Sequence, residues 1–317
     1  RYIITDVSIL FCYSSYSLYI IVKKMDVHDE PVLHIKKGRG LTKGTPSLSE
    51  PKHFIFDLDE TIGSFSELYL LFQCINSLPT SLHTDPKLLV DELLLLFPEF
   101  FRHGINVIMT YLYKKKQTGA CSGIHIYTNN SCLPDTWCYF IMSFIEERWN
   151  MKDLFDSVIR AFKIDGKIVE SKRTVNEKTH KDLLNCLLLP YDTEFCFIDN
   201  DHYAKMEHRY VYYLQPRPYY HYITREQIIE RFLNSYFGKQ ISTFMNQDIQ
   251  PLLYKWYKSQ NYSMSSTKRT LDYLETDLNT SNQLFKHVRK FFKMTRRKLH
   301  TCSNRISPDN TSRKNRL

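Results

Sequence analysis

Residues 53–61 read His-Phe-Ile-Phe-Asp-Leu-Asp-Glu-Thr, a short apolar run that ends in carboxylates. The run has the length and composition of a buried strand, which would deliver its acids at its carboxyl end. Asp57 and Asp59 point to the same side if the backbone stays extended, because side chains alternate along a strand. Two neighbouring carboxylates repel each other, and they are best tolerated around a cation or when they share a proton. Taken alone, the triplet suits a catalytic site and a solvated turn equally well.

Two further apolar runs also end in polar clusters. Residues 124–127 are followed by Thr-Asn-Asn at 128–130, and residues 195–198 by Asp-Asn-Asp at 199–201. A fourth strand is expected at 211–214. In a parallel α/β sheet, sites form beyond the carboxyl ends of the strands. All three polar clusters fall at such ends, so we expect them to meet in one site.

Helical patterns separate these runs. Amphipathic segments fill residues 64–118, a helix is expected to start at Pro134-Asp135-Thr136, and another spans 178–188. Thr224-x-x-Gln227 is a capping box that opens a further helix. Strands that alternate with helices predict an α/β fold with a parallel, Rossmann-like sheet.

Four motifs occur in the order found in one family. Residues 56–61 (Phe-Asp-Leu-Asp-Glu-Thr) resemble the Asp-x-Asp-x-Thr signature of haloacid dehalogenase-superfamily phosphatases, and their form is most similar to the RNA polymerase II C-terminal-domain phosphatase branch. Thr128 matches the second motif, Lys181-Asp-Leu the third and Asp199-Asn the acidic fourth. The resemblance covers about residues 52–236, and it implies a haloacid dehalogenase core.

The resemblance implies a role for each matched residue in catalysis. Asp57 would attack phosphorus and form an aspartyl-phosphate. Asp59 would protonate the leaving oxygen and then activate the hydrolytic water. Thr128, with the Asn129 amide, would hold a phosphoryl oxygen, and Lys181 would neutralise phosphate charge and steady Asp57.

The resemblance also implies Mg²⁺ as the cofactor. The carboxylate of Asp57, the main-chain carbonyl of Asp59 and the side chain of Asn200 would bind it, with Asp199 in or near the shell. A hard cation with oxygen ligands suits this set. A dehalogenase is disfavoured, because the family's dehalogenases lack the residue that stands here as Asp59.

Some assignments stay open at this point. Lys172 and Lys178 are alternatives to Lys181 as the phosphate-neutralising lysine, since all three lie in the same polar stretch. Asp201 suits a metal site and a solvated turn equally well. The segment from Leu154 to Tyr219 also resembles phosphatase-like proteins of large DNA viruses.

The helical insertion at about 64–118 departs from the polymerase-type branch, which carries a short β insertion and an open cleft. A helical cap would favour small phosphate esters, whereas an open cleft would favour phosphoserine or phosphothreonine in a protein. We expect a phosphatase of phosphoprotein. A phosphatase of small esters or nucleic-acid ends, and an inactive member that serves as a binding module, are the alternatives.

Composition divides the chain. Residues 281–317 carry eleven Lys and Arg against one acid, so they hold +10 of a total net charge of +9. We expect an extension and linker at 1–51, the core at 52–240, a helical extension at 241–280 and a basic tail at 281–317. The tail suits a nucleic acid or an acidic partner, or else a helix packed on the body followed by a basic end.

The ends and the cysteines suggest a compartment. Residues 2–22 are fairly apolar, but acid and serine interrupt them, so a membrane partner is not expected. Met25 is a candidate initiator, which would leave residues 1–24 untranslated. The eight cysteines form no Cys-x-x-Cys pair, which favours reduced thiols in an intracellular protein, cytoplasmic or nuclear. Only nine glycines argue against a glycine-rich nucleotide cradle.

Overall fold

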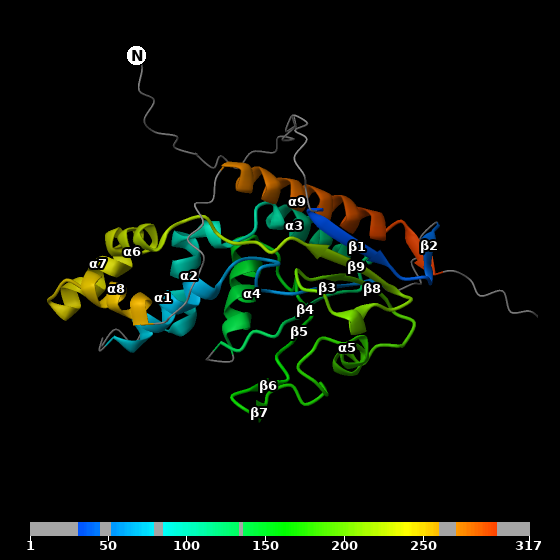
Figure 1. Cartoon of the computed structure of the whole chain (residues 1–317), viewed down its shortest axis with the longest axis horizontal. Coiled ribbons are helices and arrows are strands. Elements are labelled where there is room, and N and C mark those ends of the chain that lie inside the picture. Colours follow the sequence, from blue (N-terminus) through cyan, green and yellow to red (C-terminus); the bar gives the residue numbers. More distant parts are fainter. Residues whose placement is uncertain (1–30, 45–51, 79–84, 133–135, 260–270, 297–317) are drawn as a thin grey trace, which may run out of the picture. The chain divides into compact units, whose positions relative to one another are not determined.

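The computed structural model describes residues 31–44, 52–78, 85–132, 136–259 and 271–296. Within them, strands alternate with helices along most of the chain (Figure 1). The strands are β1 (Leu33–Lys37), β2 (Leu41–Lys43), β3 (Lys52–Phe56), β4 (Gly123–Tyr127), β5 (Ser157–Ile159), β6 (Lys163–Ile164), β7 (Lys167–Ile168), β8 (Glu194–Ile198), β9 (Val211–Pro216) and β10 (Met294–Arg296).

The helices are α1 (Ser66–Ser77), α2 (Pro86–Leu96), α3 (Ile105–Gln117), α4 (Trp137–Arg148), α5 (His180–Leu187), α6 (Arg225–Asn234), α7 (Tyr236–Met245), α8 (Gln250–Ser259) and α9 (Leu271–Phe291). Two short 3₁₀ turns, η1 (Pro98–Phe100) and η2 (Ala204–Met206), complete the set. The expected capping box is present, because Thr224 and Gln227 each bond the other's backbone at the start of α6.

The main sheet has the strand order β1-β9-β8-β3-β4-β5. β3 lies between β8 and β4 and pairs with both in parallel, and β9 and β5 extend the parallel arrangement outward. β1 runs antiparallel to β9 at one edge. The expectation of an α/β fold with a parallel sheet is therefore confirmed, with one antiparallel edge strand added, and the arrangement is compatible with a Rossmann-like core.

Alternate residues of the strands enter two separate cores. Phe54 and Phe56 of β3 face the larger core, which contains residues of α1, α3, α4 and α9. Ile55 faces a smaller core with Leu183 of α5 and Met206 of η2. β3 is buried on both faces, which is why its sequence reads as a continuous apolar run.

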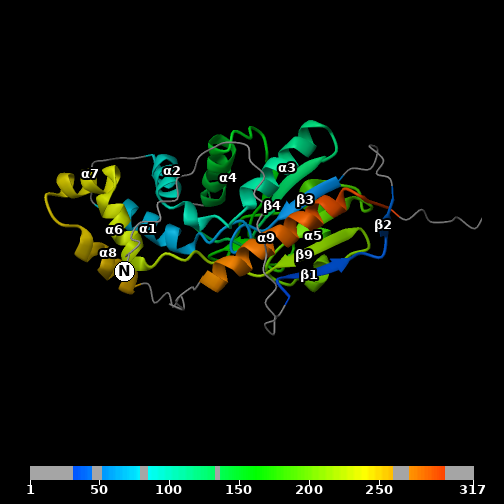
Figure 2. The ribbon, with the colours of Figure 1, turned by 90° about the horizontal axis from the view of Figure 1, so that it is seen from above.

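The insertion after β3 is helical, as the sequence predicts. α1, α2 and α3 share the larger core with the sheet, so the insertion is part of the main body. α1 packs against α2 and α8, and α2 packs against α4. Figure 2 shows α6, α7 and α8 gathered with α1 at one end of this body.

The predicted boundary at residue 281 is wrong, because it cuts through α9. This helix packs against β9, β1 and α3 (Figure 2). Leu284, Val288 and Phe291 are fully buried, so the apolar face of the helix is already covered. Of the alternatives for this region, the helix packed on the body is confirmed for residues 281–291, and residues 294–296 form β10, which pairs with β2. The rest of the predicted basic tail lies outside the described residues.

The predicted extension and linker at 1–51 also needs correction. Residues 33–37 and 41–43 form β1 and β2, which pair with β9 and β10. Both pairings join segments far apart in sequence, which local composition does not reveal. The apolar segment at 2–22 and the start at Met25 lie outside the described residues.

Two further observations concern membrane spanning and the state of the cysteines. None of the helices in the described ranges combines the length and apolar character needed to cross a bilayer. The six cysteines in these ranges are all unpaired thiols, and four of them are buried. This agrees with the expectation of reduced cysteines for that part of the chain.

Candidate functional site

The polar clusters at the ends of three neighbouring strands meet, as the sequence predicts. Asp57 follows β3, Thr128 follows β4 and Asp199 follows β8. The Asp57 amide donates to the Ile198 carbonyl at 2.9 Å, which continues the β3–β8 ladder into the site. The side chains of these three residues are buried, with exposed fractions of 7% for Asp57 and 1% for Thr128 and Asp199.

Lys178 is the cation of this site. Its ammonium donates to Asp57 Oδ1 at 2.5 Å and to Asp199 Oδ2 at 2.7 Å. Its side chain is 1% exposed and lies near the rings of Tyr127 and Tyr203. A buried lysine shared by two carboxylates joins the ends of β3 and β8.

The prediction that Lys181 serves this role is wrong. Lys181 is exposed on α5, three residues beyond Lys178. Thr179 is the N-cap of α5, and its side chain accepts a hydrogen bond from the Asp182 amide. The helix therefore starts after Lys178 and not at it, so Lys178 remains on an extended segment that reaches the strand ends.

Asp59 and Asn130 connect the first two clusters. The Asn130 side-chain amide donates to Asp59 Oδ2 at 2.7 Å, and its backbone amide donates to Thr128 Oγ1 at 2.9 Å. The other carboxylate oxygen of Asp59, Oδ1, is buried without a hydrogen-bond partner. Since the Thr128 hydroxyl accepts from Asn130, its own hydrogen is left to donate.

Thr61 orients the third cluster. Its hydroxyl donates to Asn200 Oδ1 at 2.9 Å and accepts from the Asn200 amide at 3.0 Å. The side chain of Thr61 is fully buried. The last residue of the Asp-x-Asp-x-Thr motif thus fixes the amide oxygen of Asn200, a predicted metal ligand.

Arg173 supports the loop that carries Thr128, and the sequence did not single it out. Its guanidinium donates to the Thr128 carbonyl at 3.3 Å and to Asn129 Oδ1 at 2.9 Å. It also bonds the Asn176 carbonyl at 2.7 Å, two residues before Lys178. Arg173 is 2% exposed, so it links the Thr128 loop to the Lys178 segment from within the fold. The Asn129 amide is predicted to bind phosphate. Its side-chain oxygen accepts from Arg173, and its side-chain nitrogen donates to the Tyr203 hydroxyl at 3.3 Å.

Burial and mutual repulsion set the charge state of the acids. Burial and the Asp57 charge raise the pKa of Asp59 to about 7. Burial raises the pKa of Asp199 to about 7, with Lys178 opposing the rise. Burial also raises the pKa of Asp57, although Lys178 lowers it and Asp201 adds to the rise. Burial disfavours the charged form of Lys178, but Asp199 and Asp57 outweigh this and raise its pKa.

Arg102 holds the turn that follows Asp59. Its guanidinium donates to the carbonyls of Thr61 and Glu60, each at 2.7 Å, and to Asp277 of α9 at 3.0 Å. Glu60 has a left-handed backbone with φ of 55°, which is uncommon for a residue other than glycine. Arg102 is 1% exposed, so a buried ion pair ties the turn to α9.

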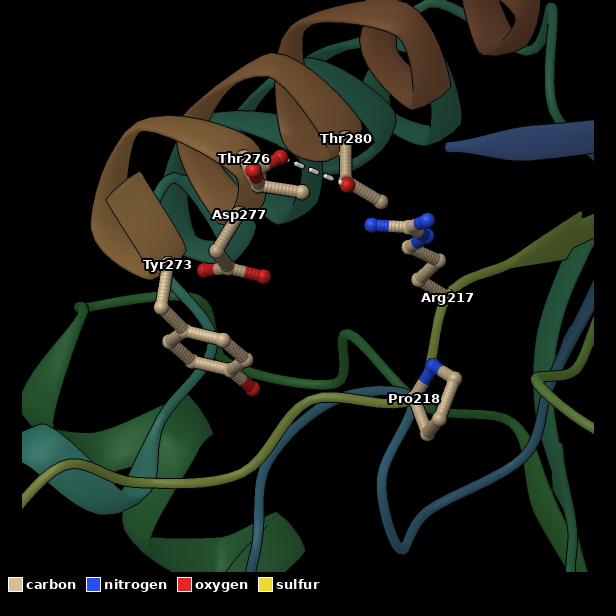
Figure 3. A pocket seen from close by; sticks show the side chains of 6 residues that line it. All are labelled: Arg217, Pro218, Tyr273, Thr276, Asp277 and Thr280. Carbon is tan, nitrogen blue, oxygen red and sulfur yellow. Dashed lines mark hydrogen bonds between the residues drawn. The ribbon is translucent and has the colours of Figure 1, made fainter. Parts of the chain in front are cut away.

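A cavity of about 170 Å³ lies on the other side of Asp277 (Figure 3). It is lined by Arg217, Pro218, Tyr273, Thr276, Asp277 and Thr280. Figure 3 shows the side chains of Arg217 and Asp277 turned toward the same space from opposite walls. None of the predicted catalytic residues lines this cavity, and Arg102 links it to the turn after Asp59 through its bonds to Asp277 and to the Arg217 carbonyl.

The groups that could hold a metal ion at this site are of different kinds: carboxylates, a side-chain amide and a main-chain turn. No three His, Cys, Asp or Glu side chains in the described ranges converge closely enough to form a metal site alone. Oxygen ligands from Asp57, Asp199 and Asn200 stand beside a main-chain turn at Asp59. Lys178 supplies one positive charge against the two carboxylates of Asp57 and Asp199, so this oxygen set can accept a divalent cation, and with that cation an anion beside Asp57.

Comparisons of the chain with protein-family models, with curated proteins and with solved structures each find no match.

Proposed function

We propose that this protein is a Mg²⁺-dependent phosphatase of the haloacid dehalogenase type that works through an aspartyl-phosphate on Asp57. The observation that carries the proposal is the buried Lys178 ammonium, which bonds both Asp57 and Asp199 at the ends of two parallel strands. A lysine beside a carboxylate nucleophile is the arrangement that phosphoryl transfer needs, because catalysis of this reaction rests on positioned charge.

Each side chain has a chemical task in this proposal. Asp57 attacks phosphorus, so that a new P–O bond forms while the ester P–O bond breaks. Asp59 donates its proton to the leaving oxygen, then takes a proton from the water that hydrolyses the aspartyl-phosphate. Its raised pKa, about 7, suits a group that must both give and take a proton near neutral pH. Lys178 and Thr128 donate to phosphoryl oxygens.

The residues present fit a magnesium ion. The carboxylates of Asp57 and Asp199 face one lysine, and Asp57 and Asp201 raise the pKa of their neighbours by repulsion. A divalent cation would relieve this excess of negative charge. Asp57, the Asp59 carbonyl, Asn200 and Asp199 would hold it, and all are oxygen donors of the kind that Mg²⁺ prefers. When bound, the ion would neutralise charge on the transferred phosphoryl group.

The substrate that the site supports best is a phosphoserine or phosphothreonine in a protein. The rim of the site includes Asn129, Asp201 and His202, which are exposed. The helical insertion shares the main core with the sheet, and this weakens the expectation that it forms a separate cap. An accessible rim allows a polypeptide to enter with its phosphorylated side chain.

The test is hydrolysis of p-nitrophenyl phosphate by the purified chain. We expect turnover with Mg²⁺, loss of turnover in EDTA, and recovery when Mg²⁺ is restored. Asp57→Asn should abolish turnover, because the neutral amide cannot attack phosphorus. Asp59→Asn should lower kcat by about 10²–10⁴-fold, the contribution of a positioned acid and base.

Asp165→Asn is the matched control, because Asp165 is an exposed acid in the β6–β7 turn and its left-handed backbone accepts asparagine. It should retain full activity. Normal turnover in Asp57→Asn would rule out this mechanism. A panel of phosphopeptides, sugar phosphates and end-phosphorylated oligonucleotides then selects the substrate class.

A further inference from the structure

A basic groove lies beside the edge strand β1, outside the proposed catalytic centre. It has a volume of about 330 Å³. Its lining residues are Lys36, Lys37, Gly38, Arg39, Glu207, His208, Arg209, Val211 and Tyr213. β1 and the turn after it form one wall, and the loop between β8 and β9 with the start of β9 forms the other. We call this feature the β1 groove.

The β1 groove brings Arg209 to a cluster of cations at 36–39 that is already local in sequence. Lys36, Lys37, Arg39 and Arg209 line it, against the single acid Glu207. Three of these cations, Lys37, Arg39 and Arg209, are exposed to solvent. Lys36 pairs with Glu207 at 2.5 Å, but both are more than 40% exposed, and such pairs contribute little free energy. Four cations around one acid favour an anionic ligand.

The floor of the β1 groove is rigid. The amides of Gly38 and Gly40 donate to the carbonyls of Val211 and Arg209, at 2.9 Å and 2.8 Å. A Cβ atom at Gly38 would lie 2.3 Å from the His208 carbonyl oxygen, so only glycine permits this approach. The two walls are therefore held together before any ligand binds, which lowers the entropy cost of binding.

The β1 groove adjoins the loop that carries the acidic cluster. Tyr213 lines the groove, and its hydroxyl donates to the Asp201 carbonyl. Lys36 contacts His202 at 2.7 Å. Asp201 and His202 directly follow Asp199 and Asn200, so this loop connects the catalytic centre to the groove. Arg39 and Arg209 lie toward the amino ends of β8 and β9, so a peptide would have to run several residues along the loop to reach them.

We infer that the β1 groove binds a second phosphate group of a multiply phosphorylated peptide whose first phosphate is at Asp57. The inference rests on the proposed function and narrows its substrate class. Arg39 and Arg209 can each bind a phosphate with two parallel hydrogen bonds, which lysine cannot do.

The lining favours a peptide over nucleic acid. Grooves for single-stranded nucleic acid combine cations with exposed aromatic faces on which bases stack. Here Tyr213 is 2% exposed, and the His208 ring is already stacked on His180 with centroids 3.8 Å apart. The lining residues therefore supply charge but no free ring.

The test compares binding of labelled peptides by fluorescence anisotropy, in an Asp57→Asn background that prevents turnover. One peptide carries a single phosphoserine, and others carry a second phosphoserine at successive positions on either side. We expect one spacing to bind about tenfold more tightly than the single phosphate, the gain of one well-paired charged contact. Arg39→Glu/Arg209→Glu should remove this gain.

Matched controls separate the groove from general charge. Lys239→Glu/Lys258→Glu changes the same charge at exposed positions of α7 and α8 and should keep the tenfold gain. With Asp57 intact, Arg39→Glu/Arg209→Glu should hydrolyse p-nitrophenyl phosphate as the wild type does. If charge reversal impairs folding, Lys37→Ala/Arg39→Ala is a milder variant of the groove. It should also reduce the tenfold gain.

The outcomes for the β1 groove and for the proposed function are distinguishable. Failure to hydrolyse p-nitrophenyl phosphate would contradict the proposed function. The binding comparison measures peptide affinity for the groove and does not depend on turnover. Equal binding of singly and doubly phosphorylated peptides at every spacing would overturn the inference. Tighter, groove-dependent binding of a 5′-phosphorylated oligonucleotide would overturn it too, in favour of nucleic acid.

Discussion

Lys178 and Lys181 differ in surroundings although they lie within one turn of each other in sequence. The Thr179 cap separates them, because it starts α5 at His180. Lys178 precedes the helix and is buried between Asp57 and Asp199, whereas Lys181 is exposed on the helix surface. A capping residue therefore decides which lysine serves the site.

This separation predicts opposite results for the same substitution. Lys178→Met should lower kcat for p-nitrophenyl phosphate by about 10²–10³-fold, because it removes a positioned cation. Lys181→Met should leave kcat unchanged. Thermal unfolding of both variants checks that the lower kcat does not come from an unfolded protein. If Lys178→Met unfolds, Lys178→Arg, which keeps the positive charge, is the variant to compare. Equal activity of the two methionine variants would contradict the assignment.

Thr61 offers a second test at the residue scale. Thr61→Val keeps the shape but removes the hydroxyl that bonds the side chain and amide of Asn200. We expect the Mg²⁺ concentration for half-maximal activity to rise about 10–100-fold, the usual effect of losing a partner behind a metal ligand. Thr61→Ser retains the hydroxyl and should stay near the wild-type value. Similar Mg²⁺ requirements in all three proteins would argue against Asn200 as a ligand.

At the scale of elements, α9 crosses the predicted boundary at residue 281 and packs on the main body. Its basic residues left open a partner-binding helix or a helix packed on the body, and the packed helix is observed, because Phe291 packs against Phe54 and Tyr212 of the sheet. Asp277 on the same helix pairs with Arg102, which in turn holds the turn after Asp59. The last described helix thus supports the first motif of the candidate site.

A double-mutant cycle measures this link. Arg102→Met should lower the free energy of unfolding by about 3–5 kcal/mol, because it leaves Asp277 buried without its main partner. Asp277→Asn should cost less, since Arg102 keeps its bonds to three backbone carbonyls. The double variant should show a coupling of about 1–3 kcal/mol in urea unfolding.

The surface pair of Lys87 and Asp91 is the control for this cycle. These residues are partly exposed and four apart on α2, so their coupling should be about 0.5 kcal/mol or less. Independent effects of Arg102 and Asp277 would mean that α9 does not support the turn.

At the scale of the whole molecule, buried histidines oppose buried acids in their response to pH. Burial lowers the pKa of His53 to about 4, and burial together with the His53 charge lowers that of His125 to about 4. The two rings bond each other at 3.0 Å, and the charge of Asp156 raises both pKa values slightly. In contrast, burial raises the pKa of Asp59 and Asp199 to about 7.

The lowered histidine pKa values and the raised acid pKa values have opposite effects on how the free energy of unfolding changes with pH. Between pH 6.5 and 4, a histidine binds a proton in the unfolded chain but not in the folded one, so acidification lowers the free energy of unfolding. The acids with raised pKa bind protons first in the folded chain, so acidification favours folding through them. Only a difference between variants isolates the histidine contribution.

His53→Gln should therefore gain stability relative to the wild type as pH falls from 6.5 toward 4. The slope of this difference should approach about 1.4 kcal/mol per pH unit, the value for one proton. Urea unfolding at several pH values measures it. His34→Gln, at an exposed position of β1, controls for the loss of a histidine. A constant difference between His53→Gln and the wild type would contradict the lowered pKa.

The sequence alone predicted the α/β class, four strands of the sheet and the strand ends where polar residues gather. It could do so because buried parallel strands leave continuous apolar runs and because their carboxyl ends share one edge. The assignments of Asp57, Asp59, Thr128, Asp199 and Asn200 to one site followed from that geometry and from the family resemblance.

Tertiary structure decided what depends on distant contacts. Lys178 was chosen over Lys181 by the point where α5 starts, and β1 became a strand by pairing with β9. α9 closed the larger core, and Arg102 joined it to the first motif. The pairing of β1 with β9 and the link from Arg102 to Asp277 leave no local signal, because their partners lie far away in the chain. The Thr179 cap is local, and the expected helix start at residue 178 overlooked it.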